Sequence, residues 1–160
     1  MRLIIFGGTG SGKTTLAKHL SKKLKIPYYT TDQMVYKHPK SYKEKYSQKE
    51  KEQNLITVSK KKNFILEGVH SAEWIEPAVK KADLIIILDY PRRVLFYRVL
   101  KRTLKEKRAL SLPILLYYSY LYKIDNKIQH LNYLKKYKKK NILIKTNKEL
   151  KTFLQNILKT

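Results

Sequence analysis

A glycine-rich loop between two apolar segments constrains the fold of this chain more than any other feature. Residues 7–14 read Gly-Gly-Thr-Gly-Ser-Gly-Lys-Thr and match the pattern GxxxxGK(S/T) at every fixed position. Residues 3–6 are apolar and of β type, and residues 15–24 carry apolar side chains at helical spacing. In such a strand–loop–helix unit, glycines let successive backbone N–H groups turn inward, and the helix start adds further free N–H groups. The unit is therefore predicted to bind the phosphates of a nucleoside triphosphate.

The same loop predicts which side chains hold the nucleotide and its metal ion. Lys13 is expected to reach the β- and γ-phosphates, and the Thr14 hydroxyl to ligate Mg²⁺. A glycine-rich turn that binds nothing is the alternative, but four glycines within six residues followed by Lys-Thr argue against it. The expected cofactors are ATP and Mg²⁺, and the predicted nucleotide-binding residues are Gly7, Gly8, Thr9, Gly10, Ser11, Gly12, Lys13, Thr14 and Thr15.

Length and composition exclude several classes of protein. At 160 residues the chain is expected to form one domain, spanning residues 1–160. It contains no cysteine, which excludes disulfides, thiolate metal sites and cysteine nucleophiles and suits a reducing cytoplasm. The N-terminus does not resemble a signal peptide, and the longest apolar stretch, residues 109–122, is too short to cross a bilayer. We therefore expect a cytoplasmic protein without a membrane partner.

The formal net charge of +24 is extreme and has three interpretations. The positive surface could bind nucleic acid or an acidic membrane. It could instead reflect a site that handles polyanions, or a Lys-, Ile-, Tyr- and Asn-rich composition of the kind that an AT-rich genome encodes. We favour composition combined with polyanion handling over dedicated nucleic-acid binding, because the lysines occur in solvated-looking runs such as residues 60–62 and 138–140.

Apolar β-type runs alternate with helical stretches along the chain. Strands are predicted at residues 2–6, 27–30, 63–67, 84–88 and 141–145, and helices at about 13–24, 43–60, 73–81, 92–108, 114–136 and 148–158. The run at 84–88 is apolar on both faces, as in a buried parallel strand. The alternation predicts a doubly wound α/β sheet, in which ligands bind beyond the carboxyl ends of the strands.

Acidic residues follow three of the predicted strands at that edge. Asp32 comes after the second strand, Glu67 at the end of the third and Asp89 after the fourth. A purely structural α/β domain would not need three carboxylates on one rim, so these residues are candidates for chemistry. Asn147-Lys148-Glu149-Leu150 after the fifth strand imitates a guanine-reading motif. However, Leu150 stands where that motif needs Asp, which argues against a regulatory GTPase.

The order of these motifs resembles the adenylate-kinase-like P-loop kinases. Within them it is most similar to the subgroup called DNA topology modulation protein, FlaR-like. The similarity is carried by Pro27-Tyr28 leading to Asp32, by Glu67-Gly68, and by Leu88-Asp89-Tyr90-Pro91-Arg92 followed by Arg98-Val99-Leu100-Lys101-Arg102. The resemblance implies a three-layer P-loop NTPase sandwich whose five parallel strands follow the order 2-3-1-4-5, with helices on both faces. Two departures concern the acceptor: Glu67 replaces the usual Asp, and residues 33–39 carry a tyrosine and a lysine rather than tryptophan.

The resemblance also implies roles for the acidic residues. An acid at Asp32 contacts the phosphoryl acceptor and takes a proton if the acceptor is an alcohol; the alternative is that Thr31 or Asp32 only caps the segment at 33–38. Glu67 is the first choice for holding a metal-bound water beside Thr14. Asp89 is the second choice, or else caps the next helix. Gly68 is placed at the acceptor. Asp32, Glu67 and Lys13 are thus the catalytic candidates outside the arginines.

Arginines on the helix after Pro91 complete the predicted site. Arg98 and Arg102 are four residues apart and so share a helix face, which similar enzymes direct at the triphosphate from a lid. A solvated basic face is the alternative for both. Arg92 is expected on the acceptor side, and a short basic lid is expected at about 102–113.

These observations leave three functions open. The first is a small-molecule kinase that moves the ATP γ-phosphate to a nucleotide, a nucleoside or a similar metabolite, acting as a monomer or homodimer. The second is a nucleic-acid-associated ATPase that binds DNA or RNA through its basic surface. The third is a nucleotide sensor without catalysis, if Glu67 cannot hold the metal. The sequence favours the kinase.

Overall fold

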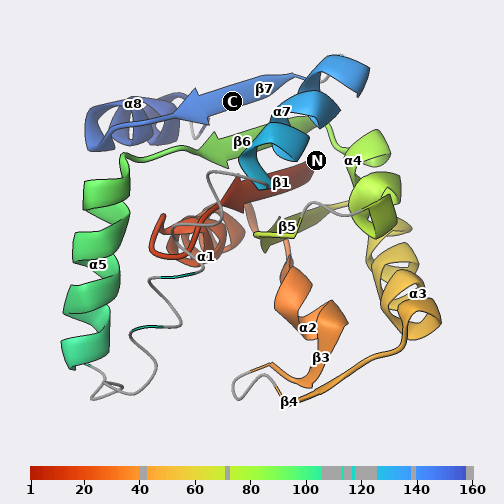
Figure 1. The fold of residues 1–160 in the computed structure, drawn as a ribbon. Coiled ribbons are helices and arrows are strands. Elements are labelled where there is room, and N and C mark those ends of the chain that lie inside the picture. The colour runs from red at the N-terminus through yellow and green to blue at the C-terminus, as the bar shows by residue number, and fades with distance from the viewer. Residues whose placement is uncertain are drawn as a thin grey trace.

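The structure is a computed structural model of residues 1–160, and it describes residues 1–39, 43–70, 73–105, 113, 117, 126–137 and 140–157. Figure 1 shows a twisted sheet with helices packed on both faces. The strands are β1 Arg2–Gly7, β2 Tyr28–Thr30, β3 Tyr36–His38, β4 Lys43–Lys45, β5 Phe64–Gly68, β6 Leu84–Leu88 and β7 Asn141–Ile144. The helices are α1 Lys13–Leu24, α2 Thr31–Val35, α3 Gln48–Ser59, the 3₁₀ turn η1 Glu73–Ile75, α4 Glu76–Lys81, α5 Arg92–Lys105, α7 Asn126–Tyr137 and α8 Asn147–Ile157.

The main sheet has five parallel strands in the order β2-β5-β1-β6-β7. Numbered along the chain without the β3–β4 hairpin, these strands follow the predicted order 2-3-1-4-5. The hairpin is an addition to the predicted strands, and it forms a separate two-stranded sheet. The α/β fold class predicted from the strand–helix alternation is confirmed.

Each face of the sheet is buried by its own set of helices. On one face, Ile4, Phe6 and Leu66 belong to a core shared with residues of α2, α3, α4 and η1, against which α7 packs. On the other face, Leu3, Ile5 and their neighbours pack with residues of α1, α5 and α8. A sheet that is covered by helices on both faces requires apolar side chains on both sides of its central strands. The predicted three layers are therefore present.

One predicted helix is wrong over its first part. Residues 43–60 were expected to be helical, but residues 43–45 form strand β4 and the helix begins at Gln48. A capping box explains the start, because Ser47 accepts from the Glu50 backbone N–H while the Glu50 side chain reaches back to the Ser47 backbone. Before this helix, β3 and β4 pair as an antiparallel hairpin, which no alternation of apolar and polar residues in the sequence predicted.

Several predicted segments lie wholly or partly outside the described residues. Residues 106–112 hold most of the predicted lid, and the predicted helix at 114–136 is described only at residue 117 and in α7. Of the predicted lid, Arg102–Lys105 form the last turn of α5, and residue 113 is the other described position. In the described part of the chain, no helix is both long enough and apolar enough to cross a membrane.

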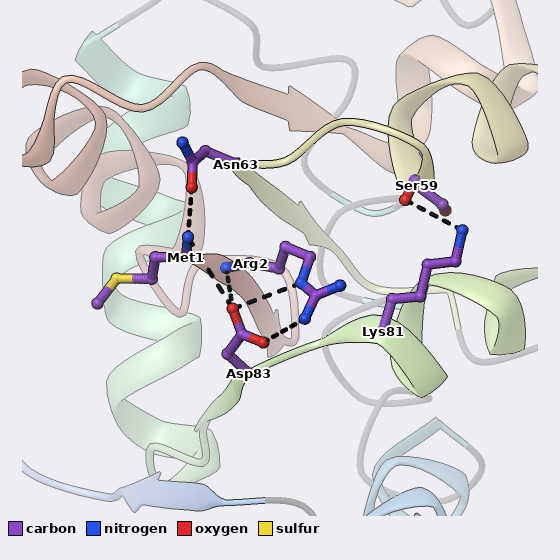
Figure 2. Close-up of polar contacts among 6 residues, drawn as sticks. All are labelled: Met1, Arg2, Ser59, Asn63, Lys81 and Asp83. Carbon is purple, nitrogen blue, oxygen red and sulfur yellow. Dashed lines mark hydrogen bonds and ion pairs between the residues drawn. The ribbon is translucent and has the colours of Figure 1, made fainter.

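Polar contacts close the edge of the sheet where the central strands begin (Figure 2). Asp83 accepts from the Arg2 backbone N–H at 2.8 Å and from Arg2 Nη2 at 2.6 Å, while the N-terminal amine of Met1 donates to Asn63. Lys81 Nζ donates to the Ser59 carbonyl oxygen at 3.3 Å. These contacts tie together the segments that lead into β1, β5 and β6, at the edge opposite the glycine loop.

Candidate active site

The glycine loop joins β1 to α1 in the geometry that phosphate binding requires. Gly10 and Gly12 adopt φ angles of +82° and +92°, which side chains with a Cβ rarely adopt. Gly12 is the N-cap of α1 and makes no side-chain cap, so the N–H groups of the first turn remain for a ligand. A Cβ on Gly10 would also lie 2.8 Å from the Leu95 carbonyl oxygen and from Val99 Cγ2, because α5 packs directly on the loop.

Thr14 and Glu67 meet at the base of the loop. Thr14 Oγ1 donates a hydrogen bond to Glu67 Oε1 at 2.8 Å, although the two residues are 53 positions apart. The parallel pairing of β1 with β5 places Glu67 opposite Ile5 and so beside the loop. Glu67 is only 4% exposed, and its Oε2 is buried without a hydrogen-bond partner among the described residues. A buried carboxylate oxygen beside a threonine hydroxyl fits a Mg²⁺ ion, which prefers hard oxygen ligands and bound water.

Burial and neighbouring charges shift the pKa values of Lys13 and Glu67, the two ionisable groups at the loop, in opposite directions. Burial lowers the pKa of Lys13, while Glu67 and Asp32 act to raise it and Arg102 lowers it further. Burial also raises the pKa of Glu67, and the positive charge of Lys13 partly offsets that effect. The Lys13 ammonium donates to the Gly8 carbonyl oxygen at 3.4 Å. Three of the other predicted catalytic groups, those of Glu67, Asp32 and Arg102, therefore all act on the charge of Lys13.

Asp32 lies in the first turn of α2, directly after β2. The alternative that Thr31 or Asp32 caps this segment is wrong, because Thr30 is the N-cap and forms a capping box with Gln33. The Asp32 carboxylate is left to contact His70, whose Nε2 lies 3.5 Å from Asp32 Oδ1. Gly68 packs tightly against Thr31, the residue before Asp32, since a Cβ at Gly68 would lie 1.9 Å from Thr31 Oγ1.

Arg98 contacts the glycine loop itself. Its Nη1 donates to the Ser11 carbonyl oxygen at 3.1 Å and its Nη2 to Asn147 Oδ1 at 2.7 Å, while its Cζ lies 4.1 Å from the centre of the Tyr90 ring. Asn147 is the first residue of the segment that resembles a guanine-reading motif. In the structure its side chain accepts a hydrogen bond from Arg98 instead. The role of Arg98 on a triphosphate stays a prediction, and the structure adds a role in holding the loop.

The other predicted side chains are placed less centrally. Arg102, one turn beyond Arg98 on α5, and Arg92, at the start of α5, are both exposed. Asp89 is 7% exposed, and its Oδ2 lies 2.8 Å from Lys127 Nζ of α7. A lysine in that position already neutralises Asp89, so Glu67 is the better placed of the two candidate metal ligands. In the described residues, no group of three or more histidine and acidic side chains is placed to hold a metal alone.

Two neighbouring histidines, His70 and His130, were not selected as site residues from the sequence. His130 of α7 is fully buried, stacks on Phe6 with ring centres 3.7 Å apart, and has Nε2 3.3 Å from the His70 carbonyl oxygen. Burial lowers the pKa of His130 to about 3, and the nearby charges of Lys13 and His70 contribute to the decrease. Because it lies inside a long predicted helix with no local motif, no sequence signal distinguished it from an ordinary core residue.

A cavity of about 650 Å³ opens between α3, η1, α4 and α7. It lies on the sheet face covered by α3 and α7, and no residue of the glycine loop lines it. Trp74 lines the cavity, and its ring centre is 5.9 Å from that of His70. Trp74, His70 and Asp32 thus form a continuous series of contacts from the cavity toward the phosphate loop.

Comparisons with known proteins agree with this arrangement. A family model described as an AAA domain (AAA_18) matches residues 3–111, more than half of the chain, and the chain therefore belongs to this family. Among solved structures, shikimate kinase from Acinetobacter baumannii in complex with shikimate is 19% identical, with a TM-score of 0.64 over 99% of this chain and 94% of that one.

Two further shikimate kinases are similar to the chain. The enzyme from Bacteroides thetaiotaomicron is 16% identical, with a TM-score of 0.61 over 100% of this chain and 99% of that one. The enzyme from Aquifex aeolicus is 27% identical, with a TM-score of 0.48 over 68% and 78%. A comparison with curated proteins found no match. The family match and the two full-length likenesses define the α/β P-loop kinase fold, with a five-stranded parallel sheet flanked by helices.

Proposed function

We propose that this protein is an ATP-dependent phosphotransferase that moves the γ-phosphate to a small-molecule acceptor. The observation that carries the proposal is the Thr14–Glu67 hydrogen bond, which joins the phosphate loop to a buried carboxylate with one oxygen left for a metal-bound water. The AAA_18 family match and the likeness to shikimate kinases support this class of reaction. The finer assignment, to the adenylate-kinase-like kinases and their FlaR-like subgroup, stays part of the proposal and rests on the sequence motifs.

In this proposal each side chain has a positional role. The loop N–H groups and Lys13 bind the triphosphate, and Thr14 and Glu67 hold Mg²⁺, which would neutralise charge on the phosphates. Asp32 lies on the acceptor side with Gly68 behind it, and His70 contacts its carboxylate. Arg98 fixes the loop, and Arg102 adds positive charge from α5. Arg92, Asp89 and a lid at about 102–113 remain predictions, as do a cytoplasmic location and a monomeric or homodimeric state.

The decisive experiment measures ADP release from Mg²⁺-ATP with a panel of small metabolites. Lys13→Ala should lose about 10³-fold in turnover, since two unit charges 4 Å apart interact by about 4 kcal/mol at an effective dielectric of 20. Lys22→Ala, which removes an exposed lysine from the last turn of the same helix, is the matched control and should retain activity. Normal turnover in Lys13→Ala, or ADP release that rises only with added DNA or RNA, would contradict the proposal.

A further inference from the structure

The Arg98 guanidinium joins three segments that lie far apart in the sequence. Its Nη1 donates to the Ser11 carbonyl oxygen of the glycine loop at 3.1 Å, and its Nη2 donates to Asn147 Oδ1 at 2.7 Å. Its Cζ lies 4.1 Å from the centre of the Tyr90 ring. Ser11 follows β1, Tyr90 follows β6 and Asn147 follows β7, so one side chain connects the carboxyl ends of three neighbouring strands.

Tyr90 gives this guanidinium a rigid surface. The Tyr90 side chain is 2% exposed and belongs to the core shared by α1, α5 and α8, where close packing holds its ring in place. Its hydroxyl donates to the Thr146 carbonyl oxygen at 3.5 Å, next to Asn147. A planar guanidinium is attracted to the face of an aromatic ring, so the stacking restricts the conformations of the long Arg98 side chain.

Asn147 is not needed to begin α8. The Thr146 hydroxyl accepts from the Glu149 backbone N–H at 3.2 Å, and the Glu149 carboxylate accepts from the Lys145 backbone N–H at 2.6 Å. These neighbours satisfy N–H groups at the start of the helix, and the Asn147 amide oxygen accepts from Arg98 instead. Because the donor carries a charge, this hydrogen bond is stronger than one between neutral groups.

The contact between Arg98 and Ser11 fixes the direction of a backbone N–H in the loop. Ser11 lies between Gly10 and Gly12, whose φ angles are +82° and +92°, and glycine has the most backbone freedom to lose. A trans peptide unit is planar, so its C=O and N–H point in opposite directions. Holding the Ser11 carbonyl toward Arg98 therefore holds the Gly12 N–H away from it. Gly12 is the N-cap of α1, where backbone N–H groups can bind a phosphate.

We propose, on the basis of the phosphotransferase function above, that Tyr90 and Asn147 are positioning residues for the nucleotide. They hold the Arg98 guanidinium, which in turn holds the peptide unit between Ser11 and Gly12 in the orientation that binds a triphosphate oxygen. The loop binds the triphosphate in the ground state as well as in the transition state. Loss of either contact should therefore raise the KM for Mg²⁺-ATP and leave kcat nearly unchanged.

Asn147 offers the least disruptive variants, because its side chain is exposed. Asn147→Ala should raise the dissociation constant of Mg²⁺-ATP about fivefold, the loss expected for one exposed hydrogen bond. It should also speed amide exchange at residues 10–12 in the nucleotide-free protein. Asn147→Asp keeps an acceptor oxygen and should restore slow exchange. Gln155→Ala removes an exposed amide from the same helix and is the matched control.

Tyr90 is tested by two substitutions that differ in whether a ring remains for stacking. Tyr90→Phe keeps the ring and loses the hydroxyl, whereas Tyr90→Leu removes the ring. Tyr90→Leu should raise the KM for Mg²⁺-ATP more than Tyr90→Phe does. Because Tyr90 is buried, urea unfolding of both variants determines the folded fraction under the assay conditions.

A double-mutant cycle with Arg98→Ala tests whether both residues act through the arginine. In the Arg98→Ala background, neither Asn147→Ala nor Tyr90→Leu should raise the dissociation constant further. A further increase as large as in the parent protein would overturn the inference. Unchanged Mg²⁺-ATP affinity and loop exchange in Asn147→Ala, or a lower kcat with an unchanged KM, would also overturn it.

Failure of the phosphotransferase function gives a different result. The parent protein would then release no ADP with any acceptor. The affinity for Mg²⁺-ATP and the amide exchange of the loop do not depend on an acceptor, so they would still test the contacts of Arg98 with Tyr90 and Asn147.

Discussion

Gly68→Ala tests how closely the end of β5 packs against α2. A Cβ at this position would lie 1.9 Å from Thr31 Oγ1, 2.6 Å from Thr31 Cγ2 and 2.8 Å from Thr31 Cβ. Non-bonded carbon atoms are most stable about 3.5–4.0 Å apart, so α2 and β5 must separate by roughly 1 Å or more. Thr31 is 1% exposed and a new rotamer would still leave its Cβ too close, so the side chain cannot move out of the way.

The expected cost of Gly68→Ala follows from this overlap. Overpacked cores lose about 1–3 kcal/mol of unfolding free energy, which is roughly a 5- to 150-fold change in the folding equilibrium. Asp32 is the residue after Thr31, so a shift of α2 also displaces the carboxylate proposed to lie on the acceptor side. A 1 Å misplacement of a catalytic group can cost about 10²-fold in rate. Urea unfolding measures the first effect, and ADP release at saturating ATP measures the second.

Substitutions of Thr31 provide the control for Gly68→Ala. Thr31→Ala removes the atoms at 1.9 Å and 2.6 Å, and Thr31→Gly also removes the one at 2.8 Å. The double variants should regain stability in that order, after the cost of each Thr31 substitution alone has been subtracted in a double-mutant cycle. If Gly68→Ala were as stable and as active as the parent protein, the close approach of β5 to α2 would be refuted.

Three further predictions concern single side chains at the site. Arg98→Ala should weaken Mg²⁺-ATP binding and speed amide exchange in the glycine loop, since hydrogen bonds from a charged group contribute about 1.5–3 kcal/mol; unchanged exchange would show that Arg98 does not hold the loop. Glu67→Gln should raise the unfolding temperature of the nucleotide-free protein, because burial disfavours the Glu67 charge, and should remove the additional stabilisation that Mg²⁺ gives in the presence of ATP. His130, with a folded pKa of about 3, contributes stability that is present above about pH 6.5 and is lost as the pH falls toward 3, by up to about 1.4 kcal/mol per pH unit. His130→Phe should flatten that part of the stability profile in urea unfolding between pH 4.5 and 7, and an unchanged slope would contradict the burial of a neutral imidazole.

The parts of the fold that could be predicted depend on local sequence. The run at 84–88 is apolar on both faces because β6 is covered on both sides of the sheet. Positions 10 and 12 require glycine because the backbone there has positive φ angles. The expectation that Glu67 lies beside Thr14 came from the resemblance to kinases, in which the third strand neighbours the first. The structure places these two residues in contact across the pairing of β1 with β5.

The features that sequence reasoning missed depend on partners distant in the chain. Thr30, rather than Thr31 or Asp32, caps α2 at its N-terminus. Thr30 has this role because β2 ends at this residue and α2 begins at the next one. The Asp89–Lys127 ion pair and the contacts of His130 require α7 to return over the sheet. The cavity needs side chains from α3, η1, α4 and α7 together, and no single segment indicates it.

The two edges of the sheet differ in how fully their polar groups are satisfied. At the edge in Figure 2, Asp83 and Arg2 satisfy each other, and the Met1 amine and Lys81 find oxygen partners. At the opposite edge, Ser11 Oγ, Thr31 Oγ1 and Glu67 Oε2 are buried without hydrogen-bond partners among the described residues. Buried polar atoms left without partners cost folding free energy, and folded proteins contain few of them. Of these atoms, Glu67 Oε2 lies beside the Thr14 hydroxyl at the base of the loop, so a bound Mg²⁺-triphosphate should stabilise this edge by giving that buried oxygen a partner.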